Sequence, residues 1–158
     1  MKVIHSARFG PLEYDPQQVI TFPKGIPGFD TFTQYILLPR DQEQGHPFYI
    51  LHAVEEGELS FMVLDTLRFF PSYEIKLADE VVEELQIDKP EDVLILTTVT
   101  IRGDWQTATT NLKAPLVINT VKRLGQQVVL DQSEYLIKQP LFEQKDIYSH
   151  GSRAQEGV

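Results

Sequence analysis

The fold is best predicted from residues 108–130, ATTNLKAPLVINTVKRLGQQVVL. Two apolar runs in this stretch, residues 116–118 and 128–130, are rich in β-branched side chains and too short for a stable helix. They therefore predict two strands. Pro115 fixes its own backbone φ and favours an extended conformation just before the first run, which supports the same prediction.

The connection between the two runs predicts a hairpin. Gly125 interrupts the sequence between them, so we expect the chain to turn through residues 120–126. Asn111 and Asn119 bracket the first strand. An asparagine at a strand end is most often a turn former that bonds its own backbone, but these two side chains could also cap polar groups at the rim of a binding groove.

Residues 93–101, VLILTTVTI, form the longest apolar run and predict a central strand with Ile95 and Val99 buried. One helix is expected over residues 79–86, with Asp79 capping its N-terminus. Further short strands are expected at residues 18–22, 35–38, 48–54, 59–65, 74–77, 105–110 and 135–137. Because no alternation of strands and helices appears, the pattern predicts a mainly β, antiparallel domain with a few short helices, either a closed barrel or a strongly curved sandwich. This domain is expected to span residues 1–142, followed by a flexible tail over residues 143–158.

Composition limits the function classes. The chain has 158 residues and no cysteine, which excludes disulfides and thiol chemistry. We expect a cytoplasmic protein with no membrane contact, because no apolar run approaches the length of a membrane-spanning helix. The net charge of −9 disfavours nucleic acid binding and favours a basic partner, although acidity can also serve solubility alone.

Much of the negative charge is concentrated between residues 79 and 92. Only Lys89 opposes the seven carboxylates Asp79, Glu80, Glu83, Glu84, Asp88, Glu91 and Asp92. These carboxylates lack the oxygen spacing of a calcium loop. The segment is therefore predicted to be either a solvated acidic face or an electrostatic docking face, with Glu80, Glu83, Glu84 and Asp88 as candidate contacts.

Residues 67–73, LRFFPSY, crowd three aromatic side chains around a proline with no strand or helix period. Phe69, Phe70 and Tyr73 either fill the core or act as anchors in a partner-binding loop.

Catalytic signals are weak. The four histidines, His5, His46, His52 and His150, show no metal-ligand spacing, and His52 is expected to be a hydrogen-bonded core residue. We expect no catalytic residue, metal or cofactor. The alternative is an enzyme or small-ligand carrier that uses a polar barrel mouth, and its candidate lining is Thr107, Thr109, Thr110, Asn111 and Asn119.

Several blocks together resemble one family. Residues 109–119, TTNLKAPLVIN, followed by a glycine and QQVVL, resemble the signature of the flagellar assembly factor FliW. Further blocks follow in the family's order: FPKGIPGF at 22–29, YILL at 35–38, PFYIL at 47–51, FMVLD at 61–65 and FFPSYE at 69–74. The resemblance covers nearly the whole chain, from about residue 18 to residue 140.

The resemblance implies a β-barrel-like domain and a regulator that acts through protein partners. Proteins of this family bind flagellin and the RNA-binding translational regulator CsrA. When flagellin occupies FliW, CsrA is free to repress flagellin translation; when FliW is released, it binds CsrA and relieves the repression. The acidic segment would suit CsrA, and the aromatic loop, with Asn111 and Asn119 at its rim, would suit an amphipathic flagellin helix.

Overall fold

The computed structural model describes residues 1–40 and 47–142 and has a mainly β fold. Its barrel consists of seven strands: β3 (Ile20–Thr21), β4 (Gln34–Arg40), β5 (Phe48–Ala53), β6 (Ser60–Asp65), β7 (Val93–Thr100), β9 (Leu116–Asn119) and β10 (Leu124–Gln127). The barrel is closed because β7 pairs with β6 along one edge and with β9 along the other. The predicted barrel-like fold is confirmed.

One pairing in the barrel departs from the prediction of an antiparallel sheet. Strands β3 and β10 are parallel, with Leu124 opposite Thr21. All other neighbours in the ring run antiparallel. A closed ring in which every neighbour is antiparallel needs an even number of strands, so a ring of seven must contain a parallel seam.

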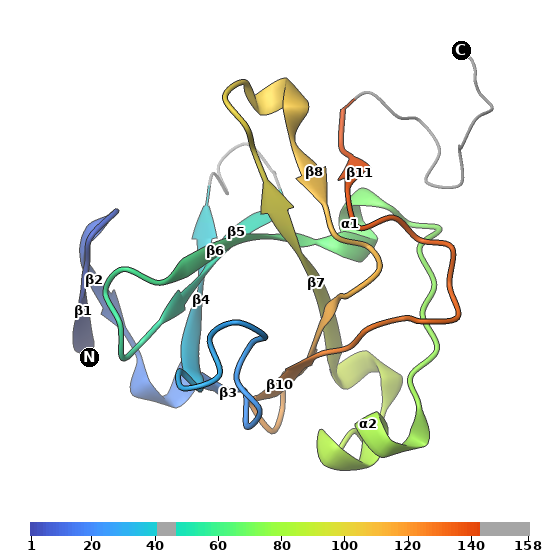
Figure 1. Cartoon of the computed structure of the whole chain (residues 1–158). Helices are drawn as coiled ribbons and strands as arrows, with labels where there is room; N and C mark the ends of the chain where they lie inside the picture. Colours follow the sequence, from blue (N-terminus) through green and yellow to red (C-terminus); the bar gives the residue numbers. More distant parts are fainter. Residues whose placement is uncertain (41–46, 143–158) are drawn as a thin grey trace.

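The remaining elements lie outside the ring. Strands β1 (Lys2–Ser6) and β2 (Gly10–Tyr14) form a separate hairpin, and β8 (Thr109–Thr110) and β11 (Gln139–Pro140) extend the sheet beyond β7. The helices are α1 (Thr66–Phe69), α2 (Asp79–Glu84) and the 3-10 turns η1 (Pro16–Gln18), η3 (Pro90–Asp92) and η4 (Trp105–Thr107). Figure 1 shows α2 at one end of the molecule and the β7–β8 hairpin, with η4 at its tip, extending at the other end.

The alternation of side chains along β7 divides the core into an inner and an outer part. Leu96 faces the barrel interior and packs in one cluster with Phe22, Tyr35 and Ile118. Ile95 faces outward into a second cluster, which also contains residues of α2 and the aromatic loop. The expected burial of Ile95 is confirmed at 6% exposure. Val99 is only half-buried, because β7 leaves the barrel near its C-terminal end.

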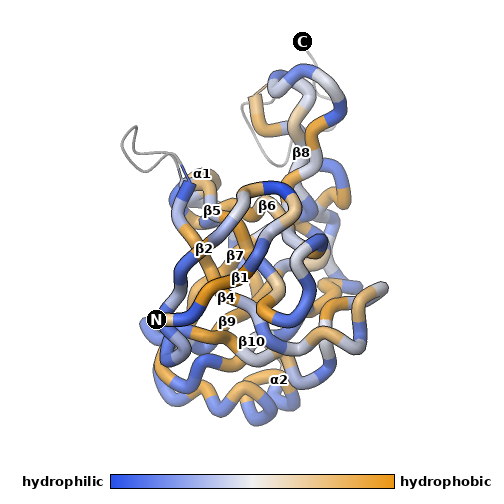
Figure 2. The backbone as a smooth tube through the Cα atoms, turned by 90° about the vertical axis from the view of Figure 1, so that its left-hand side faces the viewer, coloured by the Kyte–Doolittle hydropathy of each residue, from blue (hydrophilic) through white to orange (hydrophobic). Residues whose placement is uncertain are grey.

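The β1–β2 hairpin covers the outside of the barrel, in front of the other strands in Figure 2. Ile4 and Tyr14 pack there against Ile36 of β4. His52 of β5 is fully buried between the hairpin and the barrel, where its Nδ1 lies 2.8 Å from the Ala53 carbonyl oxygen and its Nε2 2.9 Å from Ser6 Oγ. The expectation of a hydrogen-bonded core histidine is confirmed.

The predicted hairpin after the first apolar run exists, but its turn is shorter than expected. The chain turns over residues 120–123, with Arg123 in the left-handed region at φ 58°, and Gly125 lies inside β10. A Cβ atom on Gly125 would lie 2.7 Å from the Phe22 ring, so glycine is required here by close packing rather than by the turn.

Three predicted strands are not assigned as strands in the described part of the chain, although two of them form isolated backbone hydrogen bonds: Val128 N–H donates to Pro115 O at 2.9 Å, Leu130 N–H to Lys113 O at 2.8 Å and Leu112 N–H to Leu136 O at 3.0 Å. Residues 74–77, 128–130 and 135–137 belong to no ladder. In the first of them, the Glu74 backbone bonds a side chain instead: its N–H donates to Tyr135 Oη at 3.0 Å, and its carbonyl accepts from the same hydroxyl at 2.9 Å. In residues 74–77, alternation of apolar and polar side chains therefore reflects side-chain packing and not strand pairing.

Other predicted boundaries move by a few residues. Helix α2 ends at Glu84, and Ala78 occupies the N-cap position, so the prediction that Asp79 caps the helix is wrong. Strand β4 continues through Pro39. The backbone nitrogen of Pro39, which carries no hydrogen, faces the β3 side of β4, and β3 is too short to pair at this position. The proline therefore costs no ladder hydrogen bond. The tail predicted for residues 143–158 lies outside the described residues.

Candidate functional site

An acidic surface surrounds α2. Its exposed carboxylates are Asp79, Glu80, Glu83, Glu84, Asp88 and Glu91, and Asp92 is half-buried. Only Val81 of the helix is buried, and Leu85 follows as the second anchor into the core. The helix thus attaches by one apolar edge and leaves its acidic side chains in solvent.

One of these carboxylates is paired. Glu84 lies 3.1 Å from Lys24 Nζ, and this ion pair joins α2 to the proline- and glycine-rich loop before β4. Both side chains are well exposed, so the pair contributes at most about 1 kcal/mol. Glu80, Glu83 and Asp88 form no ion pair with any residue that the structure describes.

The aromatic loop is largely part of the core. Phe70 is 8% exposed and Tyr73 3%, and the Tyr73 hydroxyl donates to the Leu112 carbonyl at 2.6 Å. Burial also raises the pKa of Tyr73 well above its usual value. Phe70 and Tyr73 therefore fill the core, and Phe69, which is half-buried, is the most exposed of the three aromatic side chains of the loop.

An exposed aromatic cluster was missed in the sequence. Trp105 is 58% exposed and Phe142 44%, and their ring centroids lie 4.9 Å apart in an edge-to-face arrangement. Phe69 adjoins them, with its centroid 6.1 Å from that of Phe142. We call Phe69, Trp105 and Phe142 the aromatic cluster. Exposed aromatic side chains of this size mark many protein interaction sites.

The two asparagines that bracket β9 have structural partners. Asn111 Oδ1 accepts from the N–H groups of Lys113 and Ala114, both at 3.1 Å. Asn119 is 1% exposed, and its Oδ1 accepts from two N–H groups of the following turn. Its Nδ2 donates to the carbonyls of Leu85 and Gln86 at the end of α2, at 2.8 and 3.0 Å. Both side-chain oxygens thus stabilise turns, as the turn-forming interpretation predicts, and the amide of Asn119 is buried against the residues that follow α2.

Two threonines of the alternative ligand site, Thr107 and Thr110, use their hydroxyls in internal hydrogen bonds. Thr110 is buried and bonds Thr97 Oγ1 at 2.7 Å, in a network that continues to Thr66. Thr107 Oγ1 binds backbone groups of its own turn. The hydroxyl network of Thr110, Thr97 and Thr66 joins β8, β7 and the start of α1.

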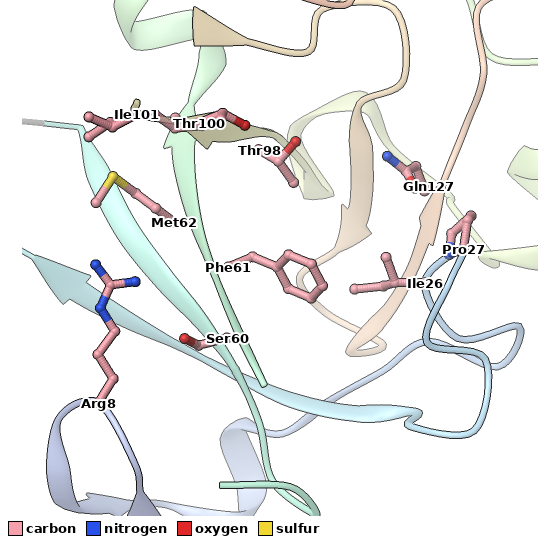
Figure 3. A pocket seen from close by; sticks show the side chains of 11 residues that line it. Arg8, Ile26, Pro27, Ser60, Phe61, Met62, Thr98, Thr100, Ile101 and Gln127 are labelled. Atoms are coloured by element: carbon pink, nitrogen blue, oxygen red, sulfur yellow. The ribbon is translucent and has the colours of Figure 1, made fainter. Parts of the chain in front are cut away.

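A cleft of about 460 Å³ opens beside the barrel, between β6 and β7. Figure 3 shows Phe61 pointing toward Ile26 on one side of it, with Met62, Arg8 and Ile101 on the other. None of its lining residues is a carboxylate. Burial raises the pKa of Asp65, at the far end of β6, but that group does not line the cleft.

Within the described ranges, no group of three or more His, Asp or Glu side chains could hold a metal ion. The helices in the same ranges are all too short or too polar to cross a membrane. His46 and His150 fall outside the described residues.

The fold and these surfaces define a small mainly β protein whose closed barrel carries an acidic helix and exposed aromatic side chains. A family model described as FliW protein matches residues 2–141. The flagellar assembly factor FliW of Clostridium beijerinckii is 40% identical over 132 residues, which cover 84% of this chain and 92% of that protein. The corresponding protein of Natranaerobius thermophilus is 39% identical over 150 residues, covering 94% of this chain and 98% of that one.

A crystal structure of the flagellar assembly factor FliW superimposes with a TM-score of 0.83 at 36% identity, covering 92% of this chain and all of that one. The chain belongs to the FliW family. The resemblance noted in the sequence is thereby confirmed, and the relatives are named for an assembly role rather than for a catalytic activity.

Proposed function

We propose that this chain is a cytoplasmic flagellar assembly factor that binds flagellin and antagonises CsrA. The observation that carries the proposal is the acidic surface on α2, whose carboxylates are exposed and almost unopposed by cations. An RNA-binding protein such as CsrA presents a basic surface, to which a negative potential is complementary. The aromatic cluster supplies a second, apolar surface of the kind that an amphipathic helix contacts.

The proposal is tested by mixing the purified protein with flagellin and with CsrA, first separately and then together. Size-exclusion chromatography should show a complex with each partner, and the mixture should show whether one partner displaces the other. Absence of both complexes would contradict the proposal.

Charge reversal on α2 should slow CsrA association. Because Glu84 is already paired with Lys24, the most informative triple variant is Glu80→Lys, Glu83→Lys and Asp88→Lys. We expect the association rate to fall roughly tenfold at low salt, whereas single reversals should change it little. The wild-type rate should also fall as salt rises, because screening shortens the reach of the charges.

The matched control reverses three exposed acids elsewhere, Glu13, Glu58 and Glu134, and changes the net charge equally. Surface plasmon resonance at low and physiological salt compares the variants. If both triple variants slow CsrA association equally, the effect is due to net charge. If the α2 triple variant associates as fast as the wild type, α2 is only a solvated face.

Flagellin binding should depend on the aromatic cluster. Trp105→Ala removes its most exposed ring without disturbing the buried core, so folding should persist while flagellin binding weakens by about 2 kcal/mol or more. Titration calorimetry with flagellin measures the binding free energy. The control is Val121→Ala, which truncates an exposed apolar side chain on the β9–β10 turn. Unchanged affinity for Trp105→Ala would remove the cluster from the interface.

A further inference from the structure

The ladder between β6 and β7 ends before either strand does. It pairs Asp65 with Leu96, Leu64 with Thr97 and Val63 with Thr98. The same register continued would place Met62 opposite Val99 and Phe61 opposite Thr100, the last residue of β7. Among the described residues those pairs are not formed, although both strands continue.

The two strands diverge because each keeps its other neighbour. Strand β6 stays paired with β5 as far as Ser60, which lies opposite His52. The end of β7 turns outward to pair with β8, where Val99 lies opposite Thr110 and Thr100 opposite Thr109. The cleft of about 460 Å³ fills the space between the diverging ends, and Figure 3 shows it lined by side chains of both strands.

Backbone groups of β6 face this cleft. Asp65 N–H donates to Pro47 O and Ala53 N–H donates to Leu59 O, so the odd-numbered positions of β6 bond to β5. Because antiparallel strands bond alternately to their two sides, the N–H groups of Ser60 and Met62 point toward β7. No described strand pairs with them there, which leaves a short open edge inside an otherwise closed barrel.

The cleft is lined by apolar and neutral polar side chains and by one cation. Phe61 and Ile26 line the inner side of the cleft, and Met62 and Ile101 line the outer side. Arg8 reaches the outer side from the β1–β2 turn, and its guanidinium forms no ion pair with a described residue. The guanidinium lies 5.5 Å from the centroid of the Phe9 ring, and no carboxylate lines the cleft beside it.

We propose that this cleft binds an extended peptide segment that adds a strand along Ser60–Met62 and places a carboxylate near Arg8. Strand addition satisfies the open N–H groups of the edge through main-chain hydrogen bonds, and the apolar residues of the lining, Phe61, Ile26, Met62 and Ile101, accept alternate side chains of the peptide. The cleft volume lies within the range of ordinary ligand sites. The inference does not depend on which protein supplies the segment, or on the proposed binding of flagellin and CsrA.

The probe is a displayed library of random peptides, selected on the full-length protein. Enriched peptides should carry at least one carboxylate and alternate apolar residues. When a synthetic copy of the best peptide is added, hydrogen exchange at the Ser60 and Met62 amides should slow, because those N–H groups become bonded. Peptide binding with no added protection at these amides, or no enrichment at all, would overturn the proposal.

Matched variants separate strand addition from other binding. Arg8→Gln should weaken the peptide about two- to fivefold, whereas Lys2→Gln, the same charge change on β1 outside the cleft, should not. Thr100→Trp should fill the cleft and weaken binding about tenfold or more, whereas Gln106→Trp at the exposed η4 turn should not.

Backbone methylation of the peptide provides the decisive comparison. N-methylation at the residues that face β6 removes main-chain donors but keeps every side chain, and it should weaken binding about fivefold or more. An N-methylated peptide that binds as well as its parent would show a side-chain pocket instead of strand addition, and the proposal would then be wrong.

Discussion

Phe70→Ala should destabilise the protein by about 3–5 kcal/mol, because it removes a buried aromatic ring from the outer core cluster. Phe70 packs edge-to-face on Phe69, with 4.9 Å between ring centroids. It directly follows α1, and its N–H donates to the carbonyl of Thr66, the first residue of that helix. The ring therefore holds α1 and the following loop against the barrel. Denaturant unfolding followed by circular dichroism measures the loss.

Phe142→Ala is the matched control. It removes the same side chain from a position that is 44% exposed, so the loss should be much smaller, about 1 kcal/mol. A loss below about 1 kcal/mol at Phe70 would show that the loop does not support the core. Because Phe70 is buried, loss of folding should precede any loss of flagellin binding in Phe70→Ala. Phe70→Leu, which keeps most of the apolar volume, separates a binding defect from an unfolding defect.

The fold was predictable because the alternation of side chains between the two faces of a strand depends only on residues that are neighbours in the sequence. In β7, Ile95 and Leu96 point to opposite sides, and both sides are apolar, so a strand covered on two faces follows from the residues alone. The structure uses both faces, one for the barrel interior and one for the outer cluster. The acidic surface was predictable for the same reason, since its charges lie within a single short segment.

Partners distant in sequence were not predictable. Residues 74–77 have the alternation of a strand, but their backbone meets the hydroxyl of Tyr135 rather than another strand. Gly125 resembles a turn residue in the sequence, but the structure shows that the Phe22 ring packs directly against it and leaves no room for a side chain. Trp105 and Phe142 come from separate segments and meet only in the folded chain. In each case the sequence shows one member of a contact, and the other member decides its role.

Asn119 is a further example, since its buried amide connects two segments that the sequence does not link. Its Oδ1 accepts from the turn between β9 and β10, and its Nδ2 donates to the carbonyls of Leu85 and Gln86, the two residues that follow α2. A helix as short as α2 has little stability of its own, so its position depends on such contacts and on Val81 and Leu85. The acidic surface is thus positioned by an asparagine on the barrel.

Asn119→Ala should therefore cost about 2–4 kcal/mol, because it leaves two backbone N–H groups and two carbonyls without their partner in a site of 1% exposure. Asn119→Asp should be at least as harmful to α2, since it keeps the acceptor for the turn but turns an oxygen toward the carbonyls of Leu85 and Gln86. Asn111→Ala is the control: it loses two similar bonds at a half-buried site, and about 1 kcal/mol is expected. Chemical unfolding gives the three free energies, and hydrogen exchange at Leu85 and Gln86 reports whether α2 has loosened. If Asn119→Asp keeps wild-type stability and protection, the amide does not hold the helix, and α2 must be positioned by its apolar contacts alone.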